Sequence, residues 1–323
     1  MPPLKAARLR TLIGCLLSLL LLSCGSPRQA LRVGTNIWIG YESLYVAEHQ
    51  GYLGDGTVRL VTMRNASEVQ QAMHAGLLDV ATLSLDEALN LIEEGQDLRV
   101  VLVMDISSGA DVVLGRPDID SLQDLRGKRI GVETTALGAV MLHACLEAAD
   151  LGPKDVQIID MGIDRHASAF RNGKIDAVVT FEPARSALLR EGAHLLFDSS
   201  MAPDRVIDVM VVTAQALERD PQSVRTLIAG HFKAIEYFRS EPLLAAGIMR
   251  PRQRLHPDDI VKAFDGIRIP DIAGNHRLLG RTAGEPGLEA NAEKLARLML
   301  ENKLLQGALD VKGLADDSFL PAP

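Results

Sequence analysis

The feature that most constrains this fold is an internal repeat, because four segments within the first 200 residues recur at a constant offset of 97 positions. Leu31–Gly34 corresponds to Lys128–Gly131, and three further pairs of segments match at the same offset. Those further matches are Ala72 and Gly76 with Ala169 and Gly173, Asp79–Ala81 with Asp176–Val178, and Glu94–Gly95 with Glu191–Gly192. An offset shared by separate segments indicates two copies of one structural unit.

Each copy alternates short apolar segments with longer amphipathic ones. The apolar segments Arg32–Gly34, Val58–Thr62 and Val80–Leu83 are typical of buried strands. The segments between them end in glycine, for example at Gly76 and Gly95, as helices often do. Alternating strands and helices predict a parallel sheet covered on both faces. We therefore expect an α/β fold of two lobes, each a mostly parallel sheet flanked by helices.

Two β-rich connections, Met104–Asp111 and Ser200–Val212, lie where the chain would pass between the lobes. Two crossings form a hinge, and a hinge beside a cleft is typical of proteins that close around a ligand. After Ser200 the pattern becomes mostly helical. The organisation that we expect is a leader at 1–23, lobe I at 24–105 plus 209–323, and lobe II at 106–208.

The N-terminus has the pattern of a secretory leader. Lys5, Arg8 and Arg10 precede an apolar run that ends at Leu22, about half of the roughly 20 residues that a membrane-spanning helix needs. A cysteine directly after Leu-x-Ser resembles the bacterial lipobox, in which Cys24 is lipidated and becomes the new N-terminus. An uncleaved anchor is the alternative. Either arrangement places the chain in the periplasm or on the cell surface, tethered to a membrane.

Removal of the leader would take the formal charge from -8 to -11, because it carries three basic and no acidic residues. Phosphate repels such an acidic chain, so we expect no nucleic-acid partner. Cys145 would be the one cysteine left without lipid, which leaves no internal disulfide. Its apolar neighbours at helical spacing predict a buried structural thiol.

Familiar catalytic and metal-binding motifs are missing from the sequence. It contains no Gly-x-x-x-x-Gly-Lys-[Ser/Thr] phosphate loop, no Gly-x-Ser-x-Gly elbow and no pair of histidines four residues apart. We therefore expect no cofactor, no metal and no enzymatic activity.

Several motifs, in their order and spacing, resemble those of periplasmic substrate-binding proteins of ABC importers, in the nitrate/sulfonate/taurine and thiamine-precursor binding group. They are Val33–Trp38, Gly76–Ala81, Leu125–Val132, Gly173–Val178 and Phe181–Pro183. The resemblance implies a type II binding-protein fold, with a small-molecule ligand between two lobes and an ABC permease as partner. We expect a monomer. A ligand-sensing module for a membrane receptor is one alternative. A pyrimidine-forming enzyme of the related fold is another, although its cysteine-rich motif is missing here.

Ligands of open α/β sheets bind beyond the carboxyl ends of the strands, which points to five loops. Trp38 and Tyr41 offer flat faces for a ligand, and Gly40 between them lets the backbone approach it. Core packing is the alternative role for Trp38. The other candidates for ligand contact are Asp86, Asp111, Glu133, Thr134, Thr135, Phe181, Glu182 and Asp208.

Plainer roles compete for the polar candidates. Ser84 and Glu87 form a capping-box pattern that leaves Asp86 free. Thr134 or Thr135 can cap the helix that follows, and Glu133 can occupy its positive end. Glu182 precedes a proline at a helix start, where a carboxylate needs no ligand.

The sign of charge in these loops is an indication of the ligand class. Only Arg185 and Arg205 stand against ten acids, namely Glu42, Asp86, Glu87, Asp105, Asp111, Glu133, Glu182, Asp198, Asp204 and Asp208. A buried oxyanion would need arginines or helix ends, so the acids favour a nitrogenous ligand that is cationic or donor-rich, stacked on Trp38. If most of the acids cap helices or face water, their number does not indicate the ligand class. The alternative ligand is a sulfonate, nitrate or taurine.

Overall fold

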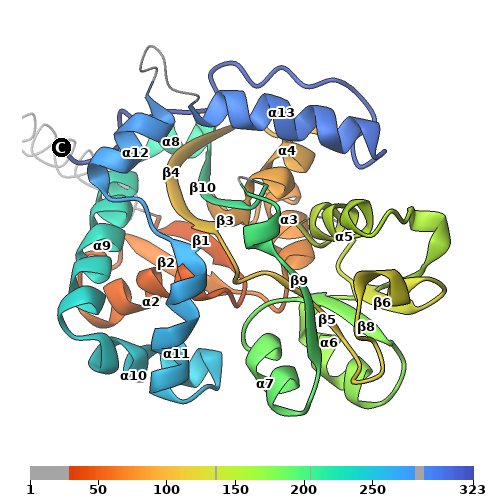
Figure 1. The fold of residues 1–323 in the computed structure, drawn as a ribbon. Helices are drawn as coiled ribbons and strands as arrows, with labels where there is room; N and C mark the ends of the chain where they lie inside the picture. Colours follow the sequence, from red (N-terminus) through yellow and green to blue (C-terminus); the bar gives the residue numbers. More distant parts are fainter. Residues whose placement is uncertain (1–28, 135–136, 204, 281–286) are drawn as a thin grey trace, which may run out of the picture. The chain divides into compact units, whose positions relative to one another are not determined.

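The computed structural model describes residues 29–134, 137–203, 205–280 and 287–323 (Figure 1). The chain divides into residues 1–30 and a compact unit, Leu31–Pro323, to which the description below applies. The predicted leader, and Cys24 with its predicted lipid, lie outside the described residues. Within the described residues, the helices are too short or too polar to cross a membrane.

The described residues form two sheets, named here sheet A and sheet B. Sheet A has the strand order β11-β4-β10-β3-β1-β2. Strand β1 runs parallel to β2 and β3, whereas β10 is antiparallel to β3 and β4, and β11 is antiparallel to β4. The bounds are β1 Leu31–Thr35, β2 Val58–Thr62, β3 Val80–Ser84, β4 Leu98–Ser107, β10 Ile207–Thr213 and β11 Ile267–Arg268.

Sheet B has the order β7-β6-β8-β5-β9 and repeats the plan of sheet A. Strand β6 runs parallel to β7 and β8, and β5 is antiparallel to β8 and β9. The bounds are β5 Val112–Gly115, β6 Arg129–Val132, β7 Gln157–Asp160, β8 Ala177–Thr180 and β9 His194–Asp198. Strand β5 therefore occupies in sheet B the place that β10 occupies in sheet A.

Both sheets are mixed, which corrects our expectation of mostly parallel sheets. The described chain passes from β4 in sheet A to β5 in sheet B, and returns from β9 to β10. Each crossing starts at the edge where the parallel strands end. The strand that follows a crossing must therefore run away from that edge, antiparallel to its neighbours. The alternation of strands and helices within one copy does not predict the direction of the strand that follows a crossing.

The repeat has a structural counterpart in two equivalent ion pairs. Arg32 donates from its backbone N and from Nε to Asp79 Oδ2, at 2.9 and 2.8 Å. Arg129 makes the same two contacts with Asp176 Oδ2, at 3.0 and 2.9 Å. Each pair joins the first strand of its copy to the start of the third, so the repeated sequence reproduces the same strand pairing twice. Helices α3 and α6, which start at Ala66 and Ile163, are also 97 residues apart.

Helices cover both sheets, and those that follow β10 are associated with sheet A. Helix α9 packs on α2, α12 on β4, and α13 on α4. The bounds are α2 Glu42–His49, α3 Ala66–His74, α4 Leu85–Glu93, α5 Leu137–Ala148, α6 Ile163–Arg171, α7 Ala184–Arg190, α8 Ala214–Arg219, α9 Pro221–Ser240, α10 Pro242–Gln253, α11 Pro257–Ala263, α12 Ile272–Leu279 and α13 Leu288–Glu301. Cys145 on α5 is buried, which confirms the predicted structural thiol, and burial raises its pKa to about 12.

Candidate functional site

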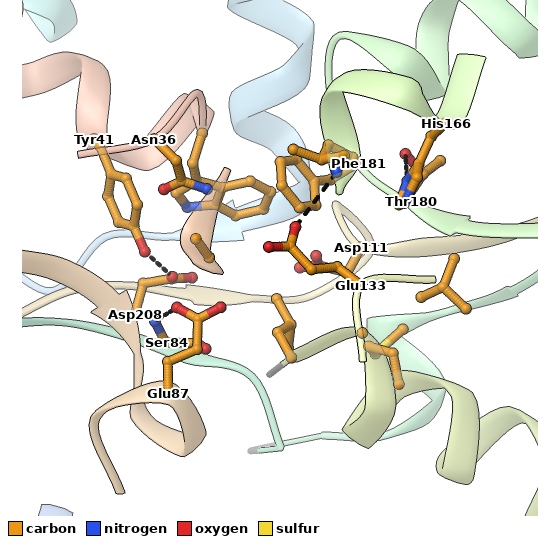
Figure 2. Close-up of a pocket in the computed structure, with 17 residues that line it drawn as sticks. Asn36, Tyr41, Ser84, Glu87, Asp111, Glu133, His166, Thr180, Phe181 and Asp208 are labelled. Carbon is orange, nitrogen blue, oxygen red and sulfur yellow. Dashed lines mark hydrogen bonds between the residues drawn. The ribbon is translucent and has the colours of Figure 1, made fainter. Parts of the chain in front are cut away.

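A cavity lies where the ends of strands from both sheets meet (Figure 2). All of the space between atoms in the cavity and its open mouth amounts to about 550 Å³. The centre of a water molecule can reach about 40 Å³ of it, room for a few waters, so the cavity is narrow. The lining residues are Asn36, Trp38, Tyr41, Ala66, Ser84, Glu87, Asp111, Glu133, Leu137, Gly138, Met141, Ile163, His166, Val179, Thr180, Phe181 and Asp208.

Two aromatic side chains meet across the cavity. Trp38 follows β1 in sheet A and Phe181 follows β8 in sheet B, and their ring centroids are 5.1 Å apart in an edge-to-face arrangement. The indole Nε1 of Trp38 donates to the carboxylate of Asp105, at 3.1 Å to Oδ2. With 3 % of its surface exposed, Trp38 belongs to the core and also lines the cavity. Its packing in the core is therefore observed, and its contact with a ligand stays a prediction.

Gly40 makes room for a buried carboxylate and is not among the lining residues. A Cβ built on Gly40 would lie 1.8 Å from Asp105 Oδ2, the atom that accepts the Trp38 hydrogen bond. Glycine is needed here because of this close approach. Gly40 therefore affects the site indirectly, because it leaves room for the Asp105 carboxylate that accepts the hydrogen bond of Trp38.

Asp105 and Asp208 face each other on neighbouring strands and form a buried pair of acids. They are register partners on β4 and β10, and Asp208 Oδ1 accepts a hydrogen bond from Tyr41 Oη at 2.5 Å. Burial raises the pKa of Asp105 to about 7, and burial together with the charge of Asp105 raises the pKa of Asp208 well above its ordinary value. Two acids in this arrangement hold a proton near neutral pH, unless a cation replaces it.

Two further acids face the cavity from different elements. Glu87 on α4 accepts a hydrogen bond from the Ser84 backbone N at 2.9 Å, and burial together with the charge of Asp86 raises its pKa well above its ordinary value. Asp111 precedes β5, and its Oδ2 has no hydrogen-bond partner among the described residues. Burial raises the pKa of Asp111 to about 7. Figure 2 shows Tyr41, Asp208 and Glu87 on one side of the cavity and Glu133 facing them from the other.

His166 on α6 lines the cavity, and sequence reasoning did not select it. Its Nδ1 lies 3.2 Å from Thr180 Oγ1 and its Nε2 lies 3.0 Å from the Met161 carbonyl oxygen. Burial lowers the pKa of His166 to about 4, so the ring is neutral at physiological pH. The described lining therefore contains acids but no lysine, arginine or charged histidine. Asn36 is a second lining residue that the sequence reasoning passed over.

Six of the residues expected from the sequence come together in this lining, namely Trp38, Tyr41, Asp111, Glu133, Phe181 and Asp208. Thr134 does not join them; its backbone N and Oγ1 donate to Asp160 Oδ1, at 3.0 and 2.7 Å. Asp86 is fully buried outside the lining, where burial raises its pKa to about 6. Thr135 lies outside the described residues.

Glu182 points to the first turn of α7, the helix that begins two residues after it. It accepts hydrogen bonds from the Ser186 backbone N at 3.0 Å, from Ser186 Oγ at 2.7 Å and from Arg185 Nη1 at 3.1 Å. It is buried but is not part of the lining. These contacts agree with the alternative role considered above, in which Glu182 is a carboxylate at a helix start and contacts no ligand.

Several of the ten acids counted in the loops have partners away from the cavity. Glu42 accepts from Arg252 Nε at 3.0 Å and from Gln253 Nε2 at 2.8 Å, and Asp198 accepts from the Ser200 backbone N at 2.9 Å. Asp204 lies outside the described residues. Among the described residues, no group of three or more histidines, cysteines or acids is arranged to hold a metal ion.

Comparisons with known proteins identify a family model, curated relatives and solved structures that the chain resembles. The family model described as "NMT1-like family" matches residues 25–246. A putative binding protein of Brucella abortus is 27% identical over 53% of this chain and 54% of its own, so the chain spans about half the length of the first curated relatives that it matches. A putative aliphatic sulfonates-binding protein of Bacillus subtilis is 22% identical over 92% of this chain and 89% of its own.

Among solved structures, the periplasmic aliphatic sulphonate binding protein SsuA from Escherichia coli superposes with a TM-score of 0.72. It is 20% identical and covers 90% of this chain and 98% of its own. At this identity the likeness concerns the fold. It confirms an α/β fold of two sheets flanked by helices, like that of periplasmic binding proteins.

Proposed function

This chain belongs to the NMT1-like family, and we propose that it is the solute-binding component of an ABC importer, acting in the periplasm rather than as an enzyme. The observation that carries the proposal is the cavity, whose lining comes from sheet A and sheet B alike. The described chain joins the two sheets by the crossings β4 to β5 and β9 to β10, the arrangement that lets two halves close on a ligand. The names of the relatives support the same role.

We further propose that residues 24–105 plus 209–323 and residues 106–208 move as two lobes about these crossings. A lipid at Cys24 would hold the protein at a membrane surface, where a permease would receive the ligand. The lobes and the anchor belong to the proposal, as does a monomeric state. A sensing role for a membrane receptor would use the same cavity.

For the ligand we propose a small nitrogenous compound, cationic or rich in hydrogen-bond donors. Glu87, Asp111 and Asp208 present acceptors in a cavity whose described lining has no lysine or arginine. Asp111 Oδ2 is buried and has no hydrogen-bond partner among the described residues, a costly state that a donor on a ligand would relieve. Trp38 and Phe181 supply aromatic surface against which such a cation can rest.

An alkanesulfonate or taurine is the second candidate ligand. It is favoured by the names of the relatives, one of which is called an aliphatic sulfonates-binding protein. A sulfonate in this cavity would need donors from backbone N–H groups, helix ends or neutral side chains such as Asn36 and Thr180, because the described lining offers no basic side chain.

A thermal-shift screen of the wild-type chain separates the two ligand classes. The probes are putrescine, spermidine, an aminopyrimidine, ethanesulfonate, taurine and nitrate, all at one ionic strength. We expect a nitrogenous probe to raise the unfolding midpoint, in line with about 2.7 kcal/mol at a hundredfold excess over its dissociation constant. Asp111→Asn should remove the ligand-induced rise, and Asp198→Asn, away from the cavity, should keep it. A rise with sulfonates alone, unchanged in Asp111→Asn, would refute the nitrogenous ligand and leave the importer role standing.

A further inference from the structure

Two helices from the two copies of the repeat start side by side at the cavity. Gly162 is the residue before α6, and a Cβ built on it would lie 2.6 Å from Nδ2 of Asn65, the residue before α3. These two positions are 97 residues apart, so the repeat brings equivalent helix starts together. Asn65 Nδ2 also donates to Asp164 Oδ1 at 3.2 Å, from one helix start to the other.

The carboxylate of Glu133 lies between these helix starts. One oxygen, Oε1, accepts a hydrogen bond from the Ser67 backbone N at 2.9 Å and another from Ser67 Oγ, both in the first turn of α3. The other oxygen, Oε2, accepts from the Ile163 backbone N at 3.4 Å, the first residue of α6. Figure 2 shows this carboxylate pointing into the cavity towards Phe181. A single side chain thus serves the N-termini of two helices.

Helix N-termini attract anions because their first N–H groups lack partners within the helix and the helix dipole is positive there. Helix α3 has a capping side chain, since Asn65 accepts from the Glu68 backbone N. Helix α6 begins after Gly162, which has no side chain to cap it. Glu133 therefore supplies an acceptor that the sequence of α6 does not provide itself. An anionic group of a ligand at this place would make the same contacts.

The rest of the cavity contains three further acids, Glu87, Asp111 and Asp208. Asp111 is 2 % exposed, lines the same cavity, and its Oδ2 lacks a hydrogen-bond partner among the described residues. This orphan oxygen calls for a donor on a ligand. An incoming anion would find the helix starts already occupied by Glu133 and its remaining surroundings acidic.

We propose that Glu133 is a specificity-determining residue, whose carboxylate stands at the paired starts of α3 and α6 in place of an anionic ligand group and so excludes sulfonates and other oxyanions from the cavity. The inference rests on the proposed function only in that the cavity holds a ligand. The role of Glu133 is independent of the ligand class, because it concerns which group accepts hydrogen bonds from the first residues of α3 and α6. Removing the Glu133 carboxylate should convert this place into an anion site.

The test compares wild type with Glu133→Ala, using Asp164→Asn as the matched control. Asp164→Asn removes a carboxylate near the same helix starts but leaves the Glu133 contacts in place. Sulfate and ethanesulfonate are the probes, titrated at constant ionic strength against chloride, with the unfolding midpoint and calorimetric binding as readouts. We expect Glu133→Ala to bind ethanesulfonate about tenfold more tightly than wild type. The control should bind it as wild type does.

Glu133→Gln is the second variant, in case Glu133→Ala does not fold. Its amide oxygen still accepts from Ser67, but without the charge the side chain holds the helix starts less firmly. It should therefore also gain ethanesulfonate binding over wild type and over Asp164→Asn. Equal ethanesulfonate binding by wild type and by both Glu133 variants would overturn the inference.

The outcomes also separate this inference from the proposed ligand class. Suppose wild type binds putrescine or an aminopyrimidine while the Glu133 variants gain no affinity for ethanesulfonate. The role of Glu133 then fails, and the nitrogenous ligand stands. Gained ethanesulfonate affinity in the variants, together with no binding of any nitrogenous probe by wild type, would establish the role of Glu133 and refute that ligand class.

Discussion

Asp111→Asn is the substitution whose effect follows most directly from the cavity. The side chain is 2 % exposed, and its Oδ2 has no hydrogen-bond partner among the described residues. Burial raises the pKa of Asp111 from an ordinary value of 3.8 to about 7, and the charge of Asp86 acts in the same direction. Asparagine has nearly the same shape and cannot ionise, so the substitution isolates the cost of the charge.

The sign follows from proton linkage. Between its unfolded and folded pKa values, Asp111 holds its proton in the folded protein and loses it in the unfolded chain. The contribution of Asp111 to the stability of the unliganded wild type therefore falls as the pH rises from about 4 to about 7. At about 1.4 kcal/mol per pKa step, the full penalty above pH 7 is at most about 4 kcal/mol. Below pH 4 the acid is neutral in both states, and the penalty vanishes.

Urea unfolding of wild type and Asp111→Asn from pH 4 to pH 8 measures this penalty. Relative to wild type, the variant should gain stability steadily with pH and level off near pH 8. Asp118→Asn makes the same change at an exposed position and serves as the matched control. A constant stability difference between wild type and Asp111→Asn over the whole range would refute a buried carboxyl with a raised pKa at this position.

Three further outcomes follow from the same structure. Gly40→Ala should destabilise the protein by about 1–3 kcal/mol in urea unfolding, because its Cβ would lie 1.8 Å from Asp105 Oδ2; unchanged stability would contradict this close approach. Cys145 should resist a thiol reagent such as Ellman's reagent in the folded protein and react on unfolding, because burial raises its pKa to about 12; fast labelling of the native state would contradict its burial. Cys24→Ala should abolish a lipid mass on the mature chain and release the protein from the membrane fraction, and identical fractionation of both forms would argue against the anchor.

Two sheets could be predicted from the repeat, whereas the antiparallel direction of the strand that follows each crossing could not. Residues 97 positions apart make equivalent contacts, such as those of Arg32 and Arg129, because each of these contacts lies within one copy of the repeat. The pairing of β10 with β3 depends on where the chain crosses between sheets. That is a property of the whole chain, and the residues of one copy do not encode it.

The candidate site could be predicted to the level of its loops, and less well to its side chains. The loops of Trp38 and Phe181, which were chosen because they follow strand ends, both line the cavity, because parallel strands share one edge. Side-chain direction depends on neighbours that a pattern does not reveal. Glu182 turns to Ser186 one helical turn further on, and Glu133 reaches the start of a helix in the other copy. In the sequence, nothing distinguishes His166 from other polar residues of a helix, so its place in the cavity lining could not be predicted.

Fluorescence of Trp38 tests the central claim, the capture of a small nitrogenous solute in this cavity, most directly. Trp38 is the single tryptophan of the chain, it lines the cavity, and its ring lies 5.1 Å from that of Phe181. Its emission reports on one place, so purified protein is titrated with putrescine, spermidine, an aminopyrimidine and ethanesulfonate. We predict a saturable shift of Trp38 emission with a nitrogenous probe and none with ethanesulfonate. Saturable binding of ethanesulfonate alone, or calorimetric binding of a nitrogenous probe that leaves Trp38 emission unchanged, would contradict the claim.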